Sequence, residues 1–315
     1  QPSIKSAVLL PHGKVTPQQL SQPLGSGAHV FEIPGVFDDC MKVVENLSTR
    51  YSVVLLNSKN PWRILGQESY SYEVAQDFDY EMADKVVVVP IGNAGNISAV
   101  MNGFLKFYRT GIIDNLPKIL GVQSEHADPV CRYYEKEKGK REFVPVTAQP
   151  SVAQAAMIGN PVSMPRVVDL AEKYNAAAGM ERVFMARVTE QSIMDWQLEA
   201  NRNGHIACTQ GGECLAGLVH AVKKGLVAED ETAIVDSTAH TLKFAGFQDL
   251  YFNKGFSQEY GIVPDPELVN SPQLIMPEDQ TCVPSQTERL SEDRFRVFLE
   301  DISARIAEKM ELKES

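Results

Sequence analysis

A short segment rich in glycine and asparagine has the composition of a phosphate-binding turn. It consists of Gly92, Asn93, Ala94, Gly95 and Asn96, and it lies between a run of four valines and a stretch of helical period. Glycine lets the backbone approach a ligand closely, and the N–H groups of a helix start attract an anion. The spacing differs from the dinucleotide fingerprint and from the Walker loop. The segment is therefore either a phosphate cradle or a strand-to-helix turn that needs glycine for its backbone angles.

A second polar segment, from Asn57 to Arg63, follows a predicted strand at Ser52–Leu56. Ligands bind beyond the carboxyl ends of the strands in open α/β sheets, so this is a suitable place for a binding site. Asn57 and Ser58 offer short-range hydrogen bonds, and the planar guanidinium of Arg63 suits a phosphate or a carboxylate. The alternative is a helix N-cap followed by a surface arginine in the first turn.

Two hydroxyl side chains, Ser237 and Thr238, follow another predicted strand. They could contact a heteroaromatic nitrogen of a ligand, or they could satisfy the backbone groups of a turn. His240, two residues further on, has the side chain of a general base. A single histidine is more often structural, and we expect the structural role here.

The segment Thr209–Cys214 contains two adjacent glycines and follows a predicted strand at Ile206–Cys208. Adjacent glycines let the backbone approach another group closely. Cys214 would need a base partner to act as a nucleophile, and the sequence identifies none. The start of a helix with an acidic first turn explains the segment equally well, so we assign no role to Glu213 or Cys214.

The composition of the 315-residue chain argues against several classes of function. A net charge of −11 is unsuited to nucleic-acid binding, which needs clustered Lys and Arg. The five cysteines are odd in number and form no C-x-x-C pair, so we expect neither a metal site nor a disulfide framework, and a reducing cytoplasm fits. No apolar run reaches the ~18 residues of a membrane span, so we expect no membrane contact.

Short β-branched runs alternate with stretches of helical period, a pattern typical of an α/β fold built on parallel strands. Besides the two strands given above, the predicted strands are Ser6–Leu10, Val30–Ile33, Lys85–Pro90, Lys118–Val122, Val183–Val188 and Ala233–Asp236. Helices are predicted at Gln18–Leu24, Asp38–Leu47 and Trp62–Ala75, and from Ile97 to Tyr108 with one apolar face.

Two further helices are predicted from their apolar faces. One face consists of Leu215, Leu218, Val219 and Val222. The other belongs to a helix capped by Ser291 and packs through Phe295, Phe298, Leu299, Ile302 and Ile306. Residues 264–284 are rich in proline and polar side chains, which predicts a long surface connection.

In this order, the segments resemble threonine synthase, a member of the tryptophan-synthase-β-like, fold type II pyridoxal-phosphate enzymes. The resemblance extends to about residue 250. Its most specific part is Asn-Ser-x-Asn-Pro-x-Arg at residues 57–63, which separates threonine synthases from dehydratases and cysteine synthases. The other matching segments are Pro11–Thr16, Gln22–Leu24, Gly35–Cys40, Val89–Ile97, Ile158–Pro161 and Thr238–Phe244.

The resemblance implies a role for each polar segment described above. The backbone of Gly92–Asn96 would hold the 5′-phosphate of pyridoxal phosphate, and Thr238 would hydrogen-bond the pyridine nitrogen. Asn57, Ser58 and Arg63 would bind the phosphate of O-phosphohomoserine. The implied reaction converts O-phospho-L-homoserine and water to L-threonine and inorganic phosphate.

The resemblance also shows what the sequence does not contain. The lysine that carries the cofactor in this family lies in a Ser-Phe-Lys-Asp-type segment, and no such segment is present. Lys106, Lys243 and Lys254 lie in other contexts, so no catalytic residue is assigned. We therefore expect the chain to lack the N-terminal part of the fold. His240-Thr241 also replaces the His-Gly or His-Pro pair common in the family.

The implied architecture is two-domain, with parallel-rich sheets. Residues 1–61 would be the remainder of a small α/β domain and residues 62–315 a large cofactor-binding domain, with the site in the cleft between them. A noncatalytic fragment or paralogue that acts as a binding module is the alternative, as is a related enzyme such as threonine dehydratase. The sequence leaves open whether the chain forms a homodimer.

Overall fold

The structure is a computed structural model that describes residues 4–56, 59–285 and 287–313. The chain divides into two compact units, residues 1–269 and 270–315. Among the described residues, no helix is both long enough and apolar enough to cross a membrane.

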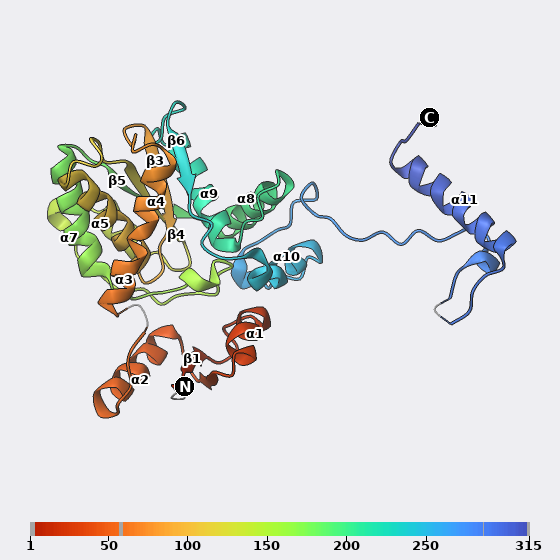
Figure 1. The fold of residues 1–315 in the computed structure, drawn as a ribbon, viewed down its shortest axis with the longest axis horizontal. Coiled ribbons are helices and arrows are strands. Elements are labelled where there is room, and N and C mark those ends of the chain that lie inside the picture. Colours follow the sequence, from red (N-terminus) through yellow and green to blue (C-terminus); the bar gives the residue numbers. More distant parts are fainter. Residues whose placement is uncertain (1–3, 57–58, 286, 314–315) are drawn as a thin grey trace. The chain divides into compact units, whose positions relative to one another are not determined.

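A four-stranded parallel sheet forms the centre of the first unit (Figure 1). Its strand order is β5-β4-β3-β6, with β3 at Lys85–Pro90, β4 at Lys118–Ser124, β5 at Val183–Val188 and β6 at Thr232–Val235. Every residue of β3 is buried, which is expected for a parallel strand covered on both faces. The structure confirms the predicted α/β class and parallel sheet.

Helices cover both faces of this sheet, and the alternating side chains of β3 divide between the two cores. Val87 and Val89 belong to the core under α4 (Ser69–Asp77), α5 (Gly95–Arg109) and α7 (Met164–Ala178). Val86 and Val88 belong to the opposite core, under α8 (Glu190–Arg202), α9 (Thr209–Lys223) and α10 (Ala245–Phe252). The four-valine run therefore stabilises both layers at once.

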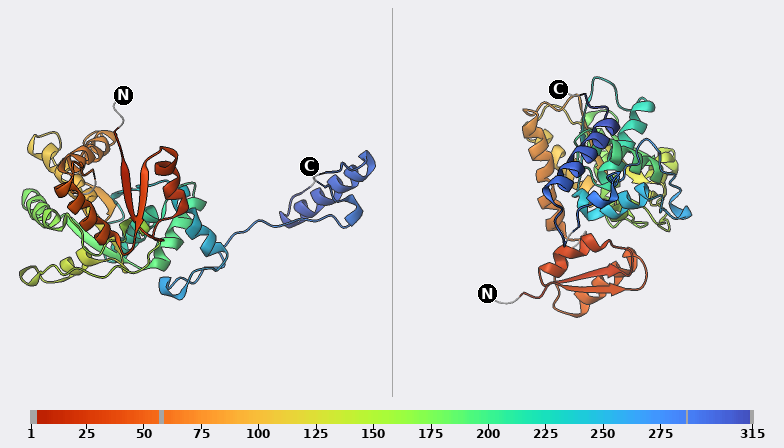
Figure 2. Two further views of the ribbon diagram at one scale, coloured as in Figure 1. Left: turned by 90° about the horizontal axis from the view of Figure 1, so that it is seen from below. Right: turned by 90° about the vertical axis from the view of Figure 1, so that its right-hand side faces the viewer.

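The N-terminal part of the first unit contains a separate two-stranded parallel sheet, visible in Figure 2. Its strands are β1 (Ala7–Pro11) and β2 (His29–Ile33), and they alternate with α1 (Pro17–Gly25) and α2 (Phe37–Arg50). A capping box between Thr16 and Gln19 begins α1. The Thr16 hydroxyl also donates to the carbonyl of Lys243 at 2.6 Å, which ties this part to a distant segment of the chain.

Short helices complete the first unit. They are α3 (Pro61–Gln67), α6 (Pro129–Glu135), and the 3₁₀ turns η1 (Lys138–Lys140), η2 (Gln154–Ala156), η3 (Thr241–Phe244) and η4 (Gln258–Tyr260). The domain boundary near residue 61 stays a prediction.

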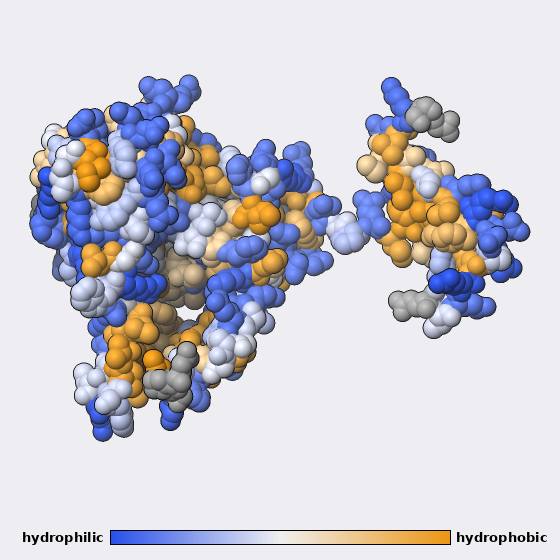
Figure 3. Space-filling model, viewed as in Figure 1, coloured by the Kyte–Doolittle hydropathy of each residue, from blue (hydrophilic) through white to orange (hydrophobic). Residues whose placement is uncertain are grey.

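The second unit consists of η5 (Gln280–Cys282) and the helix α11 (Glu292–Lys309). Ser291 is the N-cap and two acidic residues fill the first turn of α11, as predicted. Of the predicted packing face, Phe298 and Ile302 are half-buried, whereas Phe295, Leu299 and Ile306 are exposed within this unit. Figure 3 shows apolar side chains on the surface of this unit.

Two predicted strands are wrong. Ser52–Leu56 pairs with no strand and is irregular. Val54 and Leu56 are 79% and 75% exposed, so these apolar side chains do not belong to a buried sheet. Ile206–Cys208 is also irregular, and Cys208 is instead the N-cap of α9. A short apolar run becomes a strand only when a neighbouring strand satisfies its backbone groups.

The predicted helix Trp62–Ala75 divides into α3 and α4 at Glu68. The buried carboxylate of Glu68 accepts hydrogen bonds from Asn102, Lys106 and Tyr72, which anchors this point to α5.

Helix α9 approaches the sheet through small residues and not through the predicted Leu/Val face. Its buried residues are Thr209, Gln210, Gly211, Gly212, Glu213, Cys214, Ala216, Gly217 and Ala221, whereas Val222 is 43% exposed. A Cβ at Gly217 would overlap both methyl groups of Val122 on β4. Glycine is therefore the residue that sets the distance between α9 and the sheet.

We expect Gly217→Ala to lower the free energy of unfolding by about 1–3 kcal/mol, because the added methyl group overpacks the β4–α9 contact. The matched control is Gly246→Ala in α10, where a Cβ would meet nothing within 4 Å. That variant should change the free energy of unfolding by less than about 0.5 kcal/mol, because the added methyl group contacts no other atom. Urea denaturation measures both, and equal effects at the two positions would contradict the prediction.

Candidate functional site

A cavity of about 420 Å³ lies where β3 and β6 end. Three groups of residues proposed from the sequence line it together, namely Gly92–Asn96, Thr238 and Arg63. Because β3 and β6 are parallel neighbours, the segments that follow them leave the sheet at the same edge. Asn57 and Ser58 lie outside the described residues.

The turn after β3 has the geometry of an anion-binding helix start. Ala94 is the N-cap of α5 in the left-handed region, with φ 62° and ψ 13°. A Cβ at Gly92 would lie 3.2 Å from the Ala156 Cα and 3.3 Å from the Ala155 carbonyl oxygen, so a side chain there would be crowded. The first N–H groups of α5 have no acceptor within the helix, and the positive end of its dipole lies at the cavity.

The two asparagines of this turn connect it to distant segments of the chain. The Asn93 carbonyl accepts from the Ser163 N–H at 3.1 Å, and its side-chain oxygen accepts from the Val162 N–H at 3.4 Å. The Asn96 amide donates to the Asp236 carboxylate at 2.8 Å. Burial raises the pKa of Asp236, and the hydrogen bond from Asn96 opposes this shift. The turn is therefore joined to the segment that carries Thr238.

Thr238 lines the cavity, whereas His240 has a structural contact. The His240 Nδ1 accepts from the Leu242 N–H at 3.2 Å and caps η3. This contact agrees with the structural role expected for His240 from the sequence.

Arg63 lies in the first turn of α3, which begins in an ordinary way. The Asn60 side chain accepts from the Trp62 N–H at 2.9 Å as the N-cap, and Pro61 follows it. The local alternative from the sequence, an N-cap followed by an exposed arginine, therefore describes the helix start correctly. Arg63 nevertheless belongs to the same cavity wall as the Gly92–Asn96 turn.

Sequence reasoning missed Gln210, which also lines the cavity. The residue is 1% exposed, and neither its amide nitrogen nor its amide oxygen has a hydrogen-bond partner. The two glycines that follow it are a signal of close backbone approach, but nothing in the sequence indicates that the glutamine is buried.

Two buried carboxyl groups lie one turn further along α9 and on α8. Glu213 accepts from the Ser124 N–H at 2.7 Å, and Glu190 accepts from the Val152 N–H at 2.6 Å and from the Ser124 hydroxyl. Burial raises the pKa of Glu213 well above its usual value, and the nearby charge of Glu190 raises it further. Burial also raises the pKa of the Cys214 thiol, which disfavours the thiolate that a nucleophile needs.

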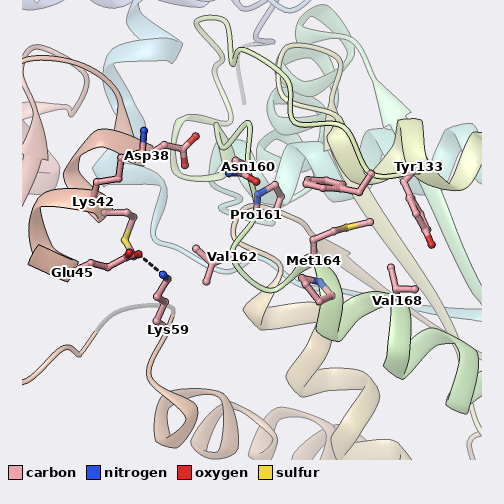
Figure 4. Close-up of a pocket in the computed structure, with 13 residues that line it drawn as sticks. Asp38, Lys42, Glu45, Lys59, Tyr133, Asn160, Pro161, Val162, Met164 and Val168 are labelled. Carbon is pink, nitrogen blue, oxygen red and sulfur yellow. Dashed lines mark ion pairs between the residues drawn. The ribbon is translucent and has the colours of Figure 1, made fainter. Parts of the chain in front are cut away.

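A second cavity, of about 730 Å³, lies beside α2 (Figure 4). One wall carries the charged side chains of Asp38, Lys42 and Glu45, the last of which pairs with Lys59, and the facing wall carries Val162 and other apolar residues. Of the site residues proposed from the sequence, none lines this cavity within the described part of the chain. In the same residues, no group of three His, Cys, Asp or Glu side chains could hold a metal ion.

Comparisons with known proteins indicate one protein family for this chain. A family model described as "Pyridoxal-phosphate dependent enzyme" matches residues 3–237. Threonine synthase of Methanocaldococcus jannaschii is 36% identical over 240 residues, which cover 76% of this chain and 57% of that protein. Threonine synthase 2, chloroplastic, of Arabidopsis thaliana is 33% identical over 255 residues, which cover 81% and 48%. The chain thus spans about half the length of the curated relatives it matches.

A solved structure gives the same result for the fold. The crystal structure of threonine synthase from Escherichia coli aligns with a TM-score of 0.64 and 25% identity. The alignment covers 78% of this chain and 55% of that one.

We expect the contribution of Glu213 to the free energy of unfolding to fall as the pH rises above 4.5, the usual pKa of a glutamate side chain, because its raised pKa favours the protonated form in the folded state. The slope contributed by one such group reaches about 1.4 kcal/mol per pH unit between its unfolded and folded pKa values. In Glu213→Gln this contribution is lost, so in urea unfolding between pH 4.5 and 8 the free energy of unfolding of the variant should rise relative to that of the unmodified chain as the pH increases.

The exposed Glu229 provides the control, since Glu229→Gln removes a carboxylate without changing the buried cluster. A Glu213→Gln profile as steep as that of the unmodified chain would show that Glu213 is ionised in the folded state.

Proposed function

We propose that this chain, which belongs to the pyridoxal-phosphate-dependent enzymes, carries the cofactor and substrate sites of a threonine synthase. The substrate would be O-phospho-L-homoserine, and the products L-threonine and phosphate. One observation carries the proposal: Gly92–Asn96, Thr238 and Arg63 line a single cavity. Two anion-binding groups, one of peptide N–H groups and one guanidinium, suit a cofactor and a substrate that each bear a phosphate.

The residues around this cavity fit pyridoxal phosphate. Glycine at position 92 lets the turn pack closely against Ala155 and Ala156, and the α5 N–H groups suit the 5′-phosphate. The Thr238 hydroxyl would hydrogen-bond the pyridine nitrogen. When bound, pyridoxal phosphate supplies an electron sink for carbanion chemistry. A hydroxyl partner, unlike a carboxylate, does not hold the ring nitrogen protonated, so Thr238 would moderate that sink.

Arg63, with Asn57 and Ser58, would bind the substrate phosphate. A guanidinium stays charged at any physiological pH and presents a planar fork to phosphate oxygens. Because the phosphate is the leaving group, a fixed cation beside it would stabilise the charge that develops as it departs. Only a phosphorylated substrate brings such a dianion, which favours a synthase over a dehydratase.

We assign the proton transfers at the α and β carbons to no residue of this chain. Within the described residues, no lysine lines the cavity. Lys106 pairs with the buried Glu68, and Lys254 lies in the turn after α10 with a positive φ of 52°.

The proposal extends to the setting of the enzyme. All five cysteines are free and buried, which supports a reducing compartment such as the cytoplasm. A homodimer stays a prediction.

We expect Arg63→Ala to weaken binding of O-phospho-L-homoserine by about 10- to 100-fold, since a hydrogen bond to a charged group contributes roughly 1.5–3 kcal/mol. Titration calorimetry in the presence of pyridoxal phosphate measures the affinity. The affinity of Arg63→Lys should lie between those of Arg63→Ala and the unmodified chain, because lysine keeps the positive charge but lacks the planar pair of N–H donors. L-homoserine, which has no phosphate, should bind the unmodified chain and the Arg63→Ala variant equally.

Arg109 provides the matched control, since it is exposed at the end of α5 and does not line the cavity. If Arg109→Ala weakens binding as much as Arg63→Ala, the effect is one of net charge, and the assignment of Arg63 is wrong. Failure of the unmodified chain to bind pyridoxal phosphate would overturn the proposed function.

A further inference from the structure

Gln210 is a buried amide with no hydrogen-bond partner for its nitrogen or its oxygen. The residue is 1% exposed, so bulk water does not supply the missing hydrogen bonds. Unpaired buried polar groups are unfavourable, and native structures contain few of them without a reason. Because Gln210 lines the cavity, the reason can be sought in a ligand.

The position of Gln210 is fixed by the packing of its neighbours on α9. A Cβ at Gly211 would lie 2.8 Å from the Ser237 hydroxyl, and a Cβ at Gly212 would lie 2.5 Å from the Ile193 carbonyl oxygen. These two close approaches hold the first turn of α9 against the segment after β6 and against α8. Gln210 therefore lines the cavity next to the segment that carries Ser237 and Thr238.

This placement indicates which part of a ligand Gln210 faces. The Gly92–Asn96 turn suits the phosphate, and Thr238 suits the ring nitrogen. The polar groups of pyridoxal phosphate that remain are the 3-oxygen and the 4-carbonyl oxygen, which are both acceptors when the 3-oxygen is ionised. A primary amide has two N–H donors for such oxygens.

We propose that Gln210 is a further cofactor-contacting residue, whose side-chain amide donates a hydrogen bond to an oxygen on the ring of pyridoxal phosphate. The inference rests on the proposed function, because it takes this cavity as the cofactor site. The Gln210 amide would be a third polar contact to the cofactor, besides the Gly92–Asn96 turn at the phosphate and Thr238 at the ring nitrogen.

Gln197 shows what a structural glutamine looks like in the same region. It is also 1% exposed and has an unpaired amide oxygen, but its amide nitrogen donates to the Ala207 carbonyl at 3.2 Å. It does not line the cavity. Gln197 is therefore a matched control for the effect of a buried glutamine on folding.

The test compares Gln210→Met and Gln197→Met with the unmodified 315-residue chain. Titration calorimetry gives the dissociation constants of pyridoxal phosphate and of inorganic phosphate, and thermal denaturation gives the midpoint of the ligand-free chain. In Gln210→Met, we expect pyridoxal phosphate to bind about 5- to 10-fold more weakly, as for one lost hydrogen bond. Inorganic phosphate should bind unchanged, and the ligand-free midpoint should stay equal or rise. The near-ultraviolet band of the bound ring should also shift, because the ionisation of the 3-oxygen changes.

The controls separate this inference from the proposed function. Gln197→Met should leave both affinities and the absorption band unchanged. The contact with the ring is wrong if Gln210→Met binds pyridoxal phosphate as tightly as the unmodified chain. It is also wrong if the variant loses affinity for inorganic phosphate by the same factor as for pyridoxal phosphate. In both cases the proposed function stands. If the unmodified chain does not bind pyridoxal phosphate, the function itself is wrong.

Discussion

The parallel pairing of β3 with β6 is the constraint on which the cavity depends. It brings the turn after β3 and the segment after β6 to one edge of the sheet, although about 140 residues separate them in sequence. The hydrogen bond from Asn96 to Asp236 then joins these two segments directly. Arg63 and Gln210 complete the walls from α3 and α9. No single segment forms the site, so its integrity depends on the central sheet.

Small residues are the second requirement, because they let secondary-structure elements approach closely around this edge. Gly217 brings α9 close to Val122 on β4, and Gly211 and Gly212 hold the first turn of α9 beside Ser237 and against α8. The turn after β3 needs glycine at Gly92 for a similar reason. The positions of Gln210 and of the buried Glu213 both follow from this packing. Larger side chains at these glycines would move the helix that carries two of the buried polar groups.

The sequence predicts the central sheet well and the irregular segments poorly. Strands buried on both faces, such as Lys85–Pro90, read as continuous apolar runs, so their type is evident from the residues alone. Ser52–Leu56 and Ile206–Cys208 have similar residues but no strand beside them, and that information is not local. The sequence indicates Thr238 and Arg63 as candidates because polar residues follow predicted strands and because the segments resemble a known family. Gln210 was missed because glutamine is usually exposed, and its burial arises only from the tertiary contacts of α9.

The hydrogen bonds made by the asparagines of the Gly92–Asn96 turn bear on how the chain would meet a ligand. Asn93 and Asn96 are already committed to Val162, Ser163 and Asp236. The rim of the cavity is therefore organised by the protein itself, and a ligand need not order it. The turn therefore loses little conformational entropy when a ligand binds. A phosphate contact then contributes to the affinity without the cost of ordering the turn.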